Sequence, residues 1–554
     1  MTTVAARKDL AEQNPTTDAP HSRRWWILAV MSLTTFMVFL DNTIVNTALP
    51  SISRDLNAST STLQWVIDAY TLVLAGLLLV GGTMGDRFGR RRFLIIGMLI
   101  FGAAAVGAAL STNSGALLAF RAMQGTGAAL VLPATLSIVT DVFPREERAQ
   151  AIGIWTGAGG LALGVGPVLG GIIVDELNWA AVFWLHLPVV ALALIGMRIV
   201  PESRDSRSLK LDVRGAVLGT AGLLALVFAI IQGNEAGWGS VQIVGMFALA
   251  VALLSLFALS QARSAAPMLP LRFFKQRDFN GAVLIIGLIF FSMMVTFFFL
   301  TQYFQLVQGK SAFVAGAGLL PMAGMMVVGA PIAGLLSGRV GPKVLVTAAG
   351  VAVVFGMIWL SRIDAETSYT TIALGLMAFG FGGGMALAPL TDTVMAAVPV
   401  NAAGIGSAVN DVSRELGAAL GIAITGSIVS GLYRSNINES LTGVVPEEFV
   451  ETASEGIGVT TIAAQSLPPD VASVVVEAAN TAFVDAFTTG LLVSAGIMAV
   501  ATVASVLLIP SRMRSDQVDE RLTEARVEDA RVEFDRPTGD ARVEPAFAAM
   551  NDGF

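Results

Sequence analysis

The sequence predicts an all-α, polytopic membrane protein, and its composition, its hydropathy and the placement of its basic residues all support this class. The chain has 554 residues, of which 54% are hydrophobic and 14% are charged. Its mean hydropathy is +0.72. Soluble domains average about 45–50% apolar and about 25% charged residues, so the composition excludes an ordinary soluble protein.

Fourteen segments are long and apolar enough to cross a bilayer, which takes about 20 residues per helix. They are predicted at residues 25–48, 63–82, 93–111, 115–140, 148–174, 180–199, 212–232, 241–260, 278–302, 313–338, 344–362, 370–394, 404–432 and 484–509.

The basic residues orient these spans, because cytoplasmic loops of membrane proteins carry an excess of Lys and Arg. With the N-terminus inside, the external segments contain only Arg54, Lys310, Arg362 and Arg434, and the cytoplasmic segments contain far more. Both termini are therefore predicted in the cytoplasm. Residues 1–24 then form a cytoplasmic segment before an uncleaved signal-anchor.

Two polar regions lie outside the predicted spans. Residues 434–483 form an external loop, in which 470–483 could be a short surface helix. Residues 511–554 form a cytoplasmic tail, in which Ala-Arg-Val-Glu occurs three times. Its charge and repetition predict disorder, and a solvated tail is favoured over a partner-binding one.

Asp41 lies inside the first predicted span, in the run Leu40–Pro50. A carboxylate at the centre of a membrane helix costs roughly 2.5–3.5 kcal/mol on insertion scales, so such a residue is a functional candidate by default. Asn42 and Asn46 follow it and could extend a polar stripe toward a cavity. The pattern predicts a proton or cation site, although Asp41 could instead snorkel to an interface or cap a helix.

The loop after the second span contains an ordered pattern of glycines and charges over Gly82–Arg92. A related pattern over 334–343 follows the tenth span, which indicates an internal repeat of the kind found in transporters. The repeat predicts two six-helix halves, at 25–199 and 278–510, with a helix pair inserted at 200–277. The residues of the first loop that carry the pattern are Gly82, Gly85, Asp86, Arg87, Gly89, Arg90 and Arg91.

Two further motifs lie in spans four and five. Arg121 is as costly in hydrocarbon as an aspartate and needs a partner, for which Asp41 is a candidate, unless Arg121 snorkels to the surface. Span five is rich in small residues, which allow helices to approach closely, and its proline removes one backbone hydrogen bond. The motif consists of Gly164, Gly166, Pro167, Gly170 and Gly171.

These four motifs together resemble those of the major facilitator superfamily, and in particular its fourteen-helix drug:proton antiporters of the QacA and EmrB type. The resemblance implies the major facilitator fold with two six-helix halves and two inserted helices, and alternating access driven by proton entry. It also implies that Gly82–Arg92 forms a cytoplasmic gate, that Arg121 takes part in proton coupling, and that the glycine motif of span five marks an exporter.

Substrate-binding candidates come from the second half. Asp411 and Glu415 share a helix face and could hold a proton or a cationic drug, but Arg414 could equally make an internal ion pair with Asp411. Met294 and Phe298 belong to a stretch of Phe and Met residues in the ninth predicted span. This stretch could line an adaptable pocket, although contact with lipid explains most of its residues. His186 stands where related exporters usually carry Asn and is interpreted as local variation.

The predicted function is proton-coupled efflux of hydrophobic drugs, cationic or amphiphilic, across the bacterial cytoplasmic membrane. The alternatives are a dedicated exporter of one metabolite, antibiotic or lipid, and a non-transporting membrane scaffold. The chain has no cysteine and only two histidines, and it lacks phosphate-loop, HExxH and GxSxG motifs. We therefore expect a transporter and not an enzyme, without metal or other cofactor and without nucleic-acid partners, that acts as a monomer on protons and small molecules.

Overall fold

The computed structural model describes residues 22–56, 60–204, 212–264, 267, 269–398, 402–509 and 511. The chain divides into a compact unit, residues 1–511, and a second unit, residues 512–554. The second unit and the segment 1–21 lie outside the described residues, so the predicted disorder of the tail stays a prediction.

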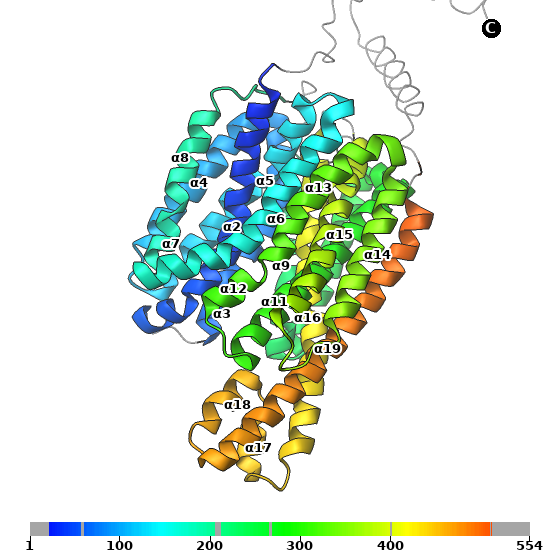
Figure 1. Ribbon diagram of the computed structural model, residues 1–554. Helices are drawn as coiled ribbons and strands as arrows, with labels where there is room; N and C mark the ends of the chain where they lie inside the picture. Colours follow the sequence, from blue (N-terminus) through cyan, green and yellow to red (C-terminus); the bar gives the residue numbers. More distant parts are fainter. Residues whose placement is uncertain are drawn as a thin grey trace, which may run out of the picture. The chain divides into compact units, whose positions relative to one another are not determined.

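The described part of the chain is helical, which confirms the all-α class (Figure 1). Thirteen of its helices are long and apolar enough to cross a membrane. The helices of the first part are α2 (Arg24–Leu56), α3 (Thr60–Phe88), α4 (Arg90–Ala109), α5 (Ser114–Val142), α6 (Arg145–Glu176), α7 (Ala180–Trp184), α8 (His186–Gly196), α9 (Val213–Ala236) and α10 (Val241–Arg263).

The remaining elements include two short irregular turns, the 3₁₀ turn η1 and the π-helical turn η2. In chain order they are η1 (Leu271–Lys275), α11 (Arg277–Gln302), η2 (Tyr303–Val307), α12 (Ala312–Gly318), α13 (Leu320–Val340), α14 (Pro342–Leu360), α15 (Tyr369–Ala396), α16 (Ala403–Leu441), α17 (Glu447–Ala453), α18 (Ile457–Ala464) and α19 (Pro469–Leu508).

The predicted sixth span, 180–199, is interrupted. It consists of α7 and α8, which are separated at Leu185, and its apolar helical stretch Ala180–Gly196 is shorter than the other spans. The physical reason is Pro188, which lacks the amide hydrogen that would bond to the carbonyl of Trp184 in a continuous helix.

Close helix packing surrounds the centre of the molecule. In the first part α2 packs on α6, and α5 on both α3 and α4; in the second part α15 packs on α13 and α14, and α11 on α16. The two sets meet where α6 packs on α13 and α3 on α16. At one of these contacts a Cβ on Gly153 would lie 2.6 Å from the carbonyl oxygen of Ala330, so only glycine permits this approach.

Helices α9 and α10 pack on each other and are joined by a polar contact. Asp212 accepts from the amide of Gly215 at 2.8 Å and so begins α9, and its other oxygen accepts from Gln261 of α10 at 2.5 Å. α9 also packs on α3 and α16. The division into two halves and an inserted pair stays a prediction at this point.

The predicted external loop 434–483 is mostly helical. α16 and α19 have 39 and 40 residues. At 1.5 Å per residue each is about 60 Å long, twice the roughly 30 Å of hydrocarbon that a span must cross. Both therefore continue beyond the membrane, where they pack with α17 and α18 (Figure 1). Buried Tyr433, Ile457 and Phe483 give this extension a core, which the loop prediction missed.

Candidate functional site

A fully buried ion pair joins the first and fourth predicted spans. A guanidinium nitrogen of Arg121, on α5, lies 2.6 Å from a carboxylate oxygen of Asp41, on α2, and neither side chain is exposed. Arg121 also donates to the carbonyl of Val66 at 2.9 Å and lies over the ring of Tyr70, 4.6 Å from its centroid. The two predicted coupling residues are thus in contact, and Arg121 does not snorkel.

Two residues that the sequence analysis did not select complete this cluster. Gln124 accepts from Arg121 at 3.0 Å and donates to Asp41 at 3.3 Å, so it bridges the pair. His186 Nε2 lies 3.3 Å from the Asp41 oxygen that accepts from Gln124, and the two atoms do not form a hydrogen bond. The position of Gln124, one helical turn after Arg121, could have identified it.

The two asparagines after Asp41 do not join the cluster. Asn46 is exposed and donates to the carbonyl of Asn42 at 3.0 Å, and Asn42 is half-buried. The polar stripe predicted from the sequence therefore ends at Asp41. A buried carboxylate with one strong cationic partner can exist ionised, and protonation removes the charge that holds that partner.

At the start of the glycine-rich loop Asp86 connects α3 to the first turn of α16. Its two oxygens accept from the backbone amides of Gly404 at 2.9 Å and Ile405 at 3.2 Å. The first amides of a helix have no partner within the helix and carry a partial positive charge, so a carboxylate is well placed there. Arg90 lies 2.8 Å from the same carboxylate. Gly82 is needed nearby, because a Cβ there would collide with the carbonyl of Gly404.

The rest of this loop holds a tight turn. Gly89 has φ of 117°, which side chains rarely adopt, and it lies between the end of α3 and the start of α4. Glu202 accepts from the backbone amide of Arg91 at 3.2 Å. Arg87 stacks on the neighbouring ring of Phe88, and a Cβ on Gly85 would meet only the backbone of Arg90 at 4.0 Å.

The glycine motif of span five lies on α6, where it packs against α2 and α12. A Cβ on Gly166 or Gly170 would collide with the hydroxyl of Thr43 or Thr47 of α2, respectively. Pro167 packs against Gly316 of α12. A Cβ on Gly164 would lie 2.5 Å from the side chain of Ala323, and one on Gly171 would lie 3.5 Å from that of Phe313. The motif is a helix-packing surface.

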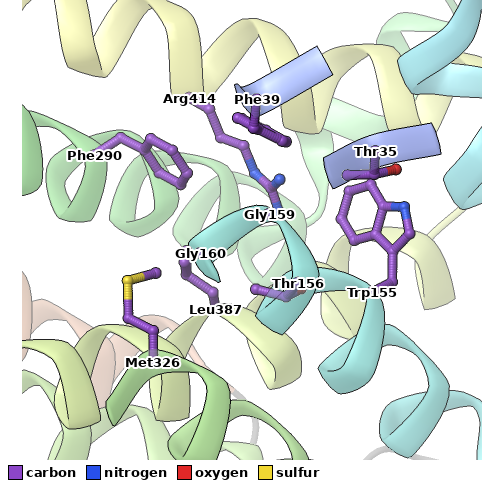
Figure 2. Close-up of a pocket in the computed structure, with 10 residues that line it drawn as sticks. All are labelled: Thr35, Phe39, Trp155, Thr156, Gly159, Gly160, Phe290, Met326, Leu387 and Arg414. Carbon is purple, nitrogen blue, oxygen red and sulfur yellow. The ribbon is translucent and has the colours of Figure 1, made fainter. Parts of the chain in front are cut away.

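A pocket lies between helices of the first and second parts (Figure 2). Ten residues from α2, α6, α11, α13, α15 and α16 line it: Thr35, Phe39, Trp155, Thr156, Gly159, Gly160, Phe290, Met326, Leu387 and Arg414. Two predicted pocket residues are not among them, since Phe298 is 42% exposed and Met294 is only half-buried. Phe290, from the same aromatic run, takes part instead.

The acidic cluster of span thirteen adjoins this pocket. Asp411 is buried and lies 3.9 Å from Arg414, which is too far for a hydrogen bond. Arg414 donates to the hydroxyl of Thr391 at 3.2 Å. Glu415 is half-buried.

With this arrangement established, a family comparison decides the class of the protein. A sequence model described as Major Facilitator Superfamily matches residues 31–422. The chain belongs to this superfamily. The predicted family is thereby confirmed, and the chain is a multi-pass membrane protein of a transporter family.

Relatives within the superfamily are named for drug resistance and export. The chain is 37% identical over 418 residues to the puromycin resistance protein pur8 of Streptomyces alboniger, with 74% of this chain and 83% of that protein covered. It is 33% identical over 505 residues to the multidrug efflux pump LfrA of Mycolicibacterium smegmatis, with 90% and 97% covered. It is 32% identical over 439 residues to the tetracenomycin C resistance and export protein of Streptomyces glaucescens, with 79% and 80% covered.

Solved structures show the same fold at low sequence identity. The chain resembles the proton:xylose symporter XylE with a TM-score of 0.58 and 14% identity, covering 88% of this chain and 96% of the other. It resembles the human organic anion transporter MFSD10 with a TM-score of 0.53 and 16% identity, covering 86% and 99%. These likenesses confirm the major facilitator fold.

Proposed function

We propose that the chain exports hydrophobic drugs across the bacterial cytoplasmic membrane in exchange for protons, and that Asp41 carries the proton. The observation that supports this most is the buried contact between Asp41 and Arg121 at 2.6 Å, with Gln124 bridging them. The relatives named for drug resistance, multidrug efflux and drug export support the direction and the substrate type.

The exchange follows from the alternation of two charge states. When the protein is open to the outside, Asp41 takes up a proton and its attraction to Arg121 weakens. When the protein is open to the cytoplasm, Asp41 releases the proton and the ion pair forms again. A membrane potential supplies about 2.3 kcal/mol per charge per 100 mV. At about 1.4 kcal/mol for each factor of ten, this drives roughly a 50-fold drug gradient.

The topology and the gate belong to the same proposal. Both termini lie in the cytoplasm, the halves 25–199 and 278–510 rock about the pocket, and 200–277 is an inserted pair. The Gly82–Arg92 loop closes the cytoplasmic side through the bonds from Asp86 to the first turn of α16. The pump acts as a monomer on small molecules and protons.

Asp41→Asn tests the proton carrier. Asparagine is close in size to aspartate and can still accept from Arg121, but it cannot exchange a proton. We expect the variant to reach the membrane and to lose proton-driven ethidium uptake into everted vesicles. Asp55→Asn is the matched control, because Asp55 lies on the same helix and is exposed. Undiminished uptake by Asp41→Asn, at equal protein levels, would remove Asp41 from the mechanism.

Two alternatives make different predictions. A dedicated exporter would protect an efflux-deficient strain against one compound, whereas a multidrug pump protects against several unrelated ones. A scaffold would show no proton-driven uptake of any compound. The buried charge cluster argues against a scaffold, because a buried ion pair adds little to stability.

A further inference from the structure

The central pocket contains a buried cation that its neighbours only partly satisfy. Arg414 is the only charged residue among the ten described residues that line the pocket, and it is 4% exposed. Its Nε and the Oδ2 oxygen of Asp411 are both buried without a hydrogen-bond partner among the described residues. Buried polar atoms are almost always hydrogen-bonded, so an unused donor at a pocket wall points to a ligand.

Two aromatic rings hold the guanidinium. The central carbon of Arg414 lies 5.1 Å from the ring centroid of Trp155, on α6, and 5.3 Å from that of Phe290, on α11. Figure 2 shows the guanidinium between these two rings. Cation–π contacts occupy the faces of the planar group, so its N–H edge remains for hydrogen bonding.

That edge is divided among three nitrogens. One terminal nitrogen donates to Thr391, and the other lies 3.9 Å from Asp411, while Nε is unused. The surrounding walls are apolar or aromatic except for the hydroxyl groups of Thr35 and Thr156, and Gly159 and Gly160 add no side chain to them. A flat, apolar molecule with an oxygen acceptor at its edge would complement both the walls of the pocket and the unused N–H group of Arg414.

We propose that the pocket selects planar aromatic substrates that carry an oxygen acceptor, such as a quinone carbonyl or a phenolate, and that Arg414 is the residue that selects them. This inference rests on the proposed function and replaces the expectation of a cationic substrate with a more specific one. A cationic drug would meet the positive charge of Arg414, whereas an oxygen acceptor receives a charge-assisted hydrogen bond.

The acidic groups near Arg414 do not reverse this selection. Asp411 does not line the pocket and lies on the same helix as Arg414. The charges of both Asp411 and Glu415 act on Arg414. Among the described residues, neither Asp411 nor Glu415 makes a hydrogen bond to Arg414 that an incoming acceptor would have to break.

The test compares two planar aromatic probes on the purified protein in lipid nanodiscs. Emodin is a hydroxyanthraquinone with carbonyl and phenol oxygens, and ethidium is a cation. Their dissociation constants are measured by thermophoresis for the wild type, R414Q and R414K. R362Q is the matched control, because Arg362 is exposed and lies in the connection after α14.

We expect R414Q to bind emodin at least about 10-fold more weakly, as befits the loss of a hydrogen bond to a charged group, and to bind ethidium equally or more tightly. R414K should also lose emodin affinity, because an ammonium cannot present a planar fork between two rings. R362Q should match the wild type.

Equal emodin affinity in the wild type and R414Q, or an equal loss for both probes, would overturn the inference. If R414Q does not elute as a folded protein, R414K replaces it in the test. Equal emodin affinity in the wild type and R414K, or an equal loss of affinity for both probes, would then overturn the inference. These measurements need no proton gradient. Failure of the proposed function would appear instead as absent uptake of both probes by wild-type vesicles, whatever the binding data show.

Discussion

Asp86→Asn is expected to shift the protein toward the state that is open to the cytoplasm. In the structure its carboxylate joins α3 to the first turn of α16 through amide bonds of 2.9 Å and 3.2 Å. A hydrogen bond to a charged group contributes about 1.5–3 kcal/mol, and a charge at a helix N-terminus about 0.3–1 kcal/mol.

The amide oxygen of asparagine can keep one of the two amide bonds, so the variant loses one bond and the helix-end charge. The minimum loss is about 2 kcal/mol, which is roughly a 30-fold change in the equilibrium between the closed and open gate. If more than about 3% of the wild-type protein is in the open state, a shift of this size would make the open state the major one in the variant.

Electron spin resonance can measure this shift directly, because the chain has no native cysteine to remove. Spin labels on cysteines introduced at the exposed positions Arg92 and Arg339 report the distance between α4 and α13. We expect Asp86→Asn to add or enlarge a longer-distance population. Asp141→Asn is the control, because Asp141 lies 3.9 Å from Arg90 and contacts it within the first half. Identical distance distributions for the wild type and Asp86→Asn would refute the assignment of the gate.

Three further outcomes are expected. Gln124→Leu should lower vesicle efflux by at least about 100-fold, since it removes two buried hydrogen bonds to charged groups, each of about 1.5–3 kcal/mol. Efflux at the wild-type rate would exclude a positioning role for Gln124. Gly417→Ala should lower the melting temperature in detergent, since its Cβ would collide with the backbone of Gly287 at a cost of about 1–3 kcal/mol. Gly431→Ala on the same helix is the control and should leave the melting temperature unchanged, because its Cβ meets open space. Deletion of 515–554 should leave efflux intact; loss of efflux would give the tail a role in transport.

The sequence was sufficient to predict the two residues whose charge is so costly in the membrane interior that each needs a partner. Asp41 and Arg121 are expensive in hydrocarbon, so their pairing could be expected from their residue types and positions alone. Glutamine carries no charge and histidine carries one only when protonated, so neither residue type demands a partner by itself, which explains why Gln124 was missed and His186 was dismissed. The bond from Asp86 to Gly404 spans 318 positions and depends on tertiary packing, so no local pattern reveals it.

The helical extension formed by residues 434–483 shows what the sequence alone could not predict. Its segments are rich in Glu, Thr, Ser and Ala, and their apolar residues are too widely spaced to indicate a membrane span. They form helices because apolar residues such as Tyr433, Val450 and Ile457 become buried where α17 and α18 pack on α16 and α19. Tertiary packing of an apolar face supplies most helical stability in proteins, and composition alone does not show it.

Helix α16 takes part in or packs near all three sites, which are the Asp86 contact, the pocket and the Asp41–Arg121 ion pair. Its first turn binds Asp86, and Arg414 lines the pocket ten residues later, about 15 Å along the helix axis. The same helix packs on α3, which carries Tyr70, and on α5, which carries Arg121. A helix moves largely as a rigid unit, so release of its first turn should also displace the pocket wall and the contacts of α16 with α5, the helix of Arg121. Proton uptake and drug release can therefore bias the same movement, which is the condition that coupled exchange requires.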